Sequence, residues 1–151
     1  MTDREEIVTG LVLRLGRRDI TGRHFPAGLM PDIDDFGLSD TEKKEACEPE
    51  GVGKLSVWDK SITPAMANAF MEQPTKTRIV LDVDVPTVVA YSHQLHVYVE
   101  PADKEYEGKD AHRVIEDVWR EDKNLRRAIQ SDLVSASKAI GRVLDTVFTE
   151  E

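Results

Sequence analysis

The sequence predicts an α+β domain built on a mostly antiparallel sheet of about four strands, with amphipathic C-terminal helices packed on one face. Two patterns carry this prediction. Apolar and polar residues alternate over residues 7–15 and 77–99, which is the period of a strand with one buried face. Over residues 110–148 the apolar residues instead recur every three or four positions, as on the buried face of a helix. Strands that come before the helices indicate the α+β class.

The first half of the chain contains the shorter elements. Residues 16–31 hold several glycines and prolines and are expected to form a long loop. Ser39 and Glu42 match a capping box, which predicts a short helix over residues 40–47. Residues 54–58 resemble a brief strand. Thr63 and Pro64 suit the start of a helix that should end near Glu72.

The second half contains the longer patterns. Pro86 interrupts the alternating run of residues 77–99, so we expect two strands there. The C-terminal helical segment, residues 109–149, would form one helix or two, with Asp122 and Asn124 as caps for a second helix. A single helix over residues 110–148 would be about 60 Å long and would protrude from a domain of this size. Its length would therefore indicate a partner or an oligomer.

Composition narrows the class of protein. The 151 residues suit a single domain over residues 1–151, with 20 Lys and Arg against 29 Asp and Glu and a net charge of -9. This charge argues against nucleic acid as a general partner. No stretch has the apolar length of a membrane span, and the charged N-terminus does not resemble an export signal. Together with a single cysteine, Cys47, these features favour a cytoplasmic location.

The charge is unevenly distributed along the chain. An acidic region over residues 31–54 holds eight acids and three lysines, whereas residues 1–30 hold five arginines and four acids. The basic loop Arg14–His24 could bind an anion or an acidic partner surface through guanidinium groups, and it could equally pair with the chain's own acidic region. Its candidate binding residues are Arg14, Arg17, Arg18 and Arg23.

A second candidate site consists of two carboxylates in the central alternating run. Asp82 and Asp84 are two residues apart on an expected strand, so both would point to one face and could hold a divalent cation. With His96 as a base and the arginines as anion ligands, they would form a metal-dependent hydrolase or phosphotransfer site. The simpler interpretation is the solvated face of a half-buried strand.

The remaining observations favour a protein without catalytic activity. No phosphate-binding loop, nucleophile elbow, C-x-x-C or H-E-x-x-H motif is present, and no cofactor is expected. We therefore predict a non-enzymatic interaction or accessory module that docks or oligomerises through its C-terminal helices. Its partner would be another protein or a second copy of the chain. The metal-dependent enzyme and the anion or nucleic-acid binder remain as alternatives.

Overall fold

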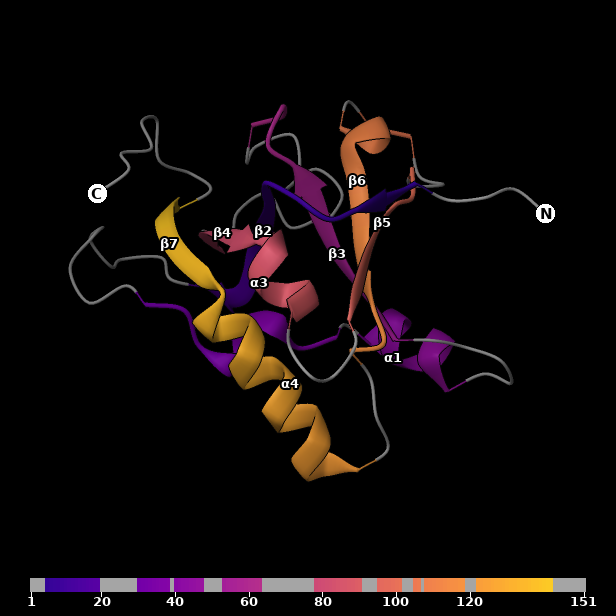
Figure 1. Ribbon diagram of the computed structural model, residues 1–151, viewed down its shortest axis with the longest axis vertical. Helices are drawn as coiled ribbons and strands as arrows, with labels where there is room; N and C mark the ends of the chain where they lie inside the picture. The colour runs from indigo at the N-terminus through magenta and orange to yellow at the C-terminus, as the bar shows by residue number, and fades with distance from the viewer. Residues whose placement is uncertain are drawn as a thin grey trace.

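The strands of the protein form one continuous antiparallel sheet. The computed structural model describes residues 5–19, 30–38, 40–47, 53–63, 78–90, 95–101, 105–106, 108–118 and 122–142. Within these residues, seven strands lie in the order β1-β5-β6-β3-β2-β4-β7 (Figure 1). The strands are β1 (Glu6–Ile7), β2 (Leu11–Asp19), β3 (Lys54–Asp59), β4 (Arg78–Asp84), β5 (His96–Val99), β6 (His112–Glu116) and β7 (Ser137–Arg142).

The described helices are short, apart from one. They are the 3-10 helices η1 (Ile33–Phe36) and η2 (Lys109–Ala111) and the α-helices α1 (Asp40–Ala46), α3 (Val85–Ala90) and α4 (Lys123–Ser135). Helix α4 has 13 residues and leads directly into β7, one of the two edge strands of the described sheet (Figure 1). The expected sheet of about four strands with C-terminal helices on one face is therefore wrong.

The largest error concerns residues 109–149. Instead of one or two helices, the described part of this segment contains η2, β6, α4 and β7. Strand β6 lies between β5 and β3 and is buried on both faces, so Val114 and Ile115 need not alternate with polar residues and mimic a helical stripe. Asp117, at φ 68°, then turns the chain before α4. A helix of 13 residues is about 20 Å long, so the argument for an oligomer from a protruding helix no longer applies.

Other expectations are closer to the structure. The helix over residues 40–47 and the strand over 54–58 are confirmed as α1 and β3, and Asp122 caps α4 through the amides of Asn124 and Leu125. The run 77–99 contains β4 and β5, but α3 lies between them. The expected strand over 7–15 is broken at Gly10, whose φ of 82° separates β1 from β2. The helix expected from Thr63 to Glu72 lies outside the described residues, apart from Thr63.

The sheet is buried on both faces near its centre. Along β4, Ile79, Leu81 and Val83 belong to one apolar cluster, while Val80 between them belongs to another. The larger cluster packs the sheet against α3, α4 and η1 through Val88, Ile129, Leu133 and Phe36, among others. The smaller cluster consists of Leu13, Leu15, Trp58, Val80 and Ile140. No solvated face of β4 exists, in contrast to the simpler interpretation of its aspartates.

The side chain of Arg14 lies between β2 and β3, at the point where these two strands stop pairing. The two strands pair only at Val12 with Asp59 and Leu13 with Trp58. Beyond that point the guanidinium of Arg14, which is 2% exposed, donates to the carbonyls of Asp35 at 2.9 Å, Ser56 at 2.8 Å and Gly37 at 3.4 Å. One side chain thus joins β2, β3 and the segment that contains η1.

Replacing Arg14 should therefore weaken the fold. Arg14→Met leaves buried carbonyls without donors, and we expect the free energy of unfolding to fall by about 3 kcal/mol. Urea unfolding followed by tryptophan fluorescence measures this loss. The exposed Lys44→Met is the control and should change stability by less than about 0.5 kcal/mol. A wild-type midpoint for Arg14→Met would contradict the role given to this arginine.

Candidate functional site

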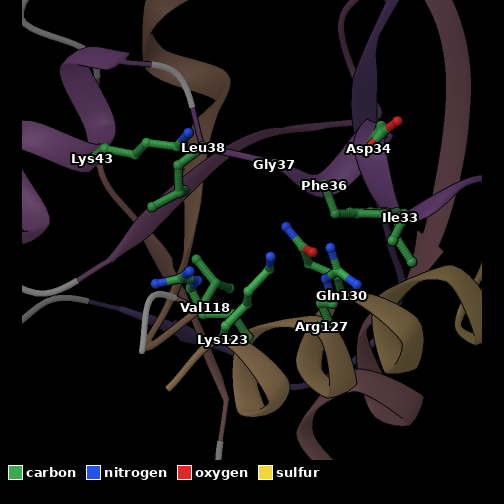
Figure 2. A pocket seen from close by; sticks show the side chains of 11 residues that line it. Ile33, Asp34, Phe36, Gly37, Leu38, Lys43, Val118, Lys123, Arg127 and Gln130 are labelled. Atoms are coloured by element: carbon green, nitrogen blue, oxygen red, sulfur yellow. The ribbon is translucent and has the colours of Figure 1, made fainter. Parts of the chain in front are cut away.

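A basic cavity lies between α4 and the segment of residues 33–38. Its volume is about 500 Å³. Figure 2 shows Lys123, Arg127 and Gln130 extending from α4 towards the middle of the cavity. Apolar side chains and Gly37 provide the opposite wall. The lining residues are Ile33, Asp34, Phe36, Gly37, Leu38, Lys43, Val118, Lys123, Arg126, Arg127 and Gln130.

The wall opposite α4 is held by local hydrogen bonds. Asp32 caps η1 by accepting from the amide of Asp34, and Asp35 accepts from the amide of Asp32, both at 3.0 Å. Arg14 anchors the same segment to β3 through the carbonyls of Asp35 and Gly37. Gly16 permits this close approach, because a Cβ there would overlap the Asp35 carboxylate. The cavity therefore has a well-anchored wall.

Helix α1 supplies the fourth cation of the cavity and is itself attached to β3. The carboxylate of Glu42 accepts from both the amide and the hydroxyl of Ser56, at 3.3 Å each. Lys43 follows Glu42 in the same helix and lines the cavity. Side chains thus satisfy both backbone groups of Ser56, since Arg14 binds its carbonyl.

The lining of the cavity is positively charged, whereas the whole chain has a negative net charge. Lys43, Lys123, Arg126 and Arg127 face a single acid, Asp34, in a protein of net charge -9. In Figure 2 the carboxylate of Asp34 points away from the cavity. Within the part of the chain that the structure describes, no ion pair is found for Lys43, Lys123 or Arg127. The arrangement suits an anion.

The three cations of α4 also lie near the N-terminus of the helix, where positive charge is unfavourable. Lys123 is its first residue, and Arg126 and Arg127 follow within the next turn. The positive end of the helix dipole and like-charge spacings of three and four residues both raise their energy. No acidic residue occurs within the first turn, so the carboxylate of the N-cap, Asp122, is what offsets this effect among the described residues. Asp122 caps the helix end, so an anion would be held by side chains along the helix.

Asp82 and Asp84 have structural partners. Asp82 forms an ion pair with Lys60 at 2.8 Å, while its other oxygen is buried without a hydrogen-bond partner among the described residues. Asp84 accepts from the amide and the hydroxyl of Thr87, as a cap of α3. Both aspartates line a second cavity, of about 390 Å³, together with Lys138. Lys60, which pairs with Asp82, and Lys138, which lines the cavity, are both positively charged and oppose the binding of a divalent cation here.

His96 does not meet these aspartates. It lies on β5, and β6, β3 and β2 separate that strand from β4. Its Nδ1 lies 2.7 Å from the Glu6 carboxylate, and its ring stacks on Tyr98. The described residues contain no group of three His, Cys, Asp or Glu side chains that could hold a metal ion.

The predicted basic loop is only partly described. Arg14 is buried on backbone carbonyls, as shown above. Arg17 and Arg18 belong to β2, but their side chains are outside the described structure, and Arg23 and His24 lie outside the described residues. The cations that the structure brings together are therefore different ones.

His112 forms a second polar group, away from the basic cavity. Its Nδ1 lies 2.7 Å from the carbonyl of Glu100, so this nitrogen carries the proton. Its Nε2 lies 3.0 Å from the hydroxyl of Ser56, and its ring makes a T-shaped contact with that of Trp58. Ser56 and His112 are both more than nine-tenths buried and line neither of the two cavities described, so the pair fits a structural hydrogen-bond network.

The environment of His112 makes stability depend on pH. Burial lowers the pKa of its imidazole, although the bond to Glu100 and the carboxylates of Glu100 and Glu42 act in the opposite direction. The unfolded chain therefore takes up the proton more readily than the folded chain. The stabilisation is present in full above the ordinary pKa of 6.5 and is lost as the pH falls towards the lowered value.

We expect His112→Gln to remove this pH dependence. Gln keeps an amide donor and acceptor but does not titrate, so the wild type should lose more stability than the variant between pH 7 and about pH 5.5. Urea unfolding at a series of pH values measures both slopes. Parallel curves would show that His112 is not responsible.

Comparisons with protein-family models, curated proteins and solved structures found no match. Among the described helices, none has the length and apolar character needed to cross a membrane.

Sequence reasoning missed the cations of the basic cavity. A usable signal was present, because the predicted cap at Asp122 is followed by Lys123, Arg126 and Arg127. Three basic residues in the first turns of a helix are unusual in an acidic protein, since the helix dipole opposes them. Lys43 could not be added to this group from sequence, because its position depends on how α1 packs on β3.

Proposed function

We propose that the protein is a non-enzymatic interaction module that binds an acidic segment of a protein partner in the basic cavity. One observation carries the proposal: four cations gather around this cavity in a chain of net charge -9. Of the C-terminal helices through which docking was predicted, the proposed surface uses one, α4. A cytoplasmic partner is proposed with it, in keeping with the single exposed cysteine, Cys47.

The lining of the cavity supports a peptide as the ligand. Beside the cations, it presents Ile33, Leu38 and Val118, which could contact an apolar side chain next to an acidic one. A long polyanion such as nucleic acid would meet the acidic remainder of the surface, which repels it. A short acidic segment avoids most of that repulsion.

The metal-dependent alternative has less support. Lys60 occupies one oxygen of Asp82, and Asp84 caps α3. His96, the base that such an enzyme would require, is on a distant strand. Among the described residues, the pair therefore lacks the base that this alternative assigned to it.

Two neighbouring lysines allow a matched test of the docking surface. Both lysines are exposed on α1, but Lys43 lines the cavity and Lys44 does not. We expect Lys43→Glu to weaken binding of a fluorescein-labelled peptide with four glutamates and two leucines by about tenfold or more, and Lys44→Glu to weaken it by less than about threefold. Both variants change the net charge equally. Fluorescence anisotropy at fixed ionic strength measures the affinities.

The proposal fails if the peptide does not bind the wild type. It also fails if Lys43→Glu and Lys44→Glu weaken binding equally, because the effect would then come from overall charge. A second copy of the chain is the other occupant to distinguish. Its binding would appear as dimerisation of the protein in light scattering without peptide, and that result would overturn the acidic segment as the occupant.

The positive charge of Lys123 at the start of α4 should lower the free energy of unfolding of the protein without a ligand. Replacing Lys123 by Glu puts a negative charge at the positive end of α4 and an attractive partner four residues before Arg127. We expect the free energy of unfolding to rise by about 1 kcal/mol, while peptide binding is lost. Urea unfolding and anisotropy on the same sample measure both. A less stable Lys123→Glu variant would contradict the electrostatic cost assigned to this lysine.

A further inference from the structure

We propose that the acidic segment is phosphorylated, and that the basic cavity holds the phosphomonoester of a phosphoserine or phosphothreonine. This inference rests on the proposed docking function and narrows its ligand. It follows from the number, the placement and the chemical type of the cations that line the cavity.

The charge of the cavity exceeds that of one carboxylate. Four cations, Lys43, Lys123, Arg126 and Arg127, line it together with one acid, Asp34. The lining therefore carries an excess of three positive charges. A phosphomonoester carries about -1.5 to -2 at pH 7, whereas a glutamate carries -1. A single glutamate would leave part of this charge unbalanced in the cavity.

The donors also suit a group with three acceptor oxygens. Lys43 comes from α1, while Lys123, Arg127 and Gln130 come from two successive turns of α4. Figure 2 shows the nitrogen-bearing ends of the α4 side chains directed into the same space. A carboxylate has two oxygens in one plane, whereas a phosphoryl group can accept from several directions at once. Arginine in addition offers a planar fork that binds phosphate through two parallel bonds.

The apolar part of the cavity favours a phosphorylated protein segment over a free phosphate ion. Ile33 and Val118 line the same space as the cations and offer no hydrogen-bond donor from their side chains. They suit the methylene or methyl group of the modified residue and the side chain beside it. The free ion would leave this apolar surface uncovered.

Three matched peptides test the inference with the wild-type protein. They share one acidic sequence and carry phosphoserine, glutamate or alanine at the central position. We expect the phosphoserine peptide to bind about tenfold more tightly than the glutamate peptide at pH 7.5. Phenyl phosphate, added as a competitor, should bind more weakly than the phosphoserine peptide. Lys43→Glu should abolish the preference for phosphoserine, and Lys44→Glu should retain it.

A pH series adds a readout that is specific to the phosphoryl group. Its second proton has a pKa of about 6, so affinity for the phosphoserine peptide should rise between pH 5.5 and pH 7.5. The glutamate peptide, whose side chain has an ordinary pKa of about 4.3, should bind nearly equally over this range. A flat profile for the phosphoserine peptide would overturn the inference.

The outcomes separate this inference from the proposed function. Equal affinity for the phosphoserine and glutamate peptides overturns the phosphorylated ligand and leaves the acidic segment standing. Phenyl phosphate that binds as tightly as the phosphoserine peptide overturns the protein segment as its source. If none of the peptides binds, both proposals fail.

Discussion

The buried guanidinium of Arg14 is the interaction on which the rest of the structure depends. Strand β2 pairs with β3 over only two residue pairs, and beyond them the amide and carbonyl of Ser56 in β3 are bound by side chains and not by β2. Arg14 supplies donors to the carbonyl of Ser56 and, on its other side, to those of Asp35 and Gly37. Glu42 completes the same junction by accepting from the amide of Ser56. Two charged side chains thus replace strand pairing at this point.

This junction connects the sheet to the basic cavity. Arg14 attaches the segment of residues 33–38 to β3, and Glu42 attaches α1, which carries Lys43. The opposite wall is α4, whose Ile129 and Leu133 pack in the larger core cluster while Lys123, Arg126 and Arg127 line the cavity. The cations are therefore held between two anchored walls. Their unfavourable position at the start of α4 is a cost to the free protein that an anion would offset.

Local signals in the sequence predicted the elements that depend on local chemistry. The cap of α4 at Asp122 and the positions of α1 and β4 were readable, because each is specified by neighbours within a few residues; Ser39, the predicted cap of α1, lies outside the described residues. The helical interpretation of His112–Glu116 failed because this central strand is buried on both faces, so its apolar residues Val114 and Ile115 are adjacent and do not alternate with polar ones. Arg14 was interpreted as a surface cation because its partners, 21 to 42 residues away, are known only from the fold. The same reason kept Lys43 and the α4 cations from being grouped in advance.

Native-state hydrogen exchange on Arg14→Lys tests most directly whether this arginine holds the cavity wall. This substitution removes the planar fork of guanidinium donors but keeps the positive charge. The amides of Asp35 and Gly37, which donate within η1, should then exchange faster than in the wild type, whereas those of the β5–β6 pair keep their protection. Unchanged exchange at Asp35 and Gly37, or an equal increase throughout the sheet, would contradict the account.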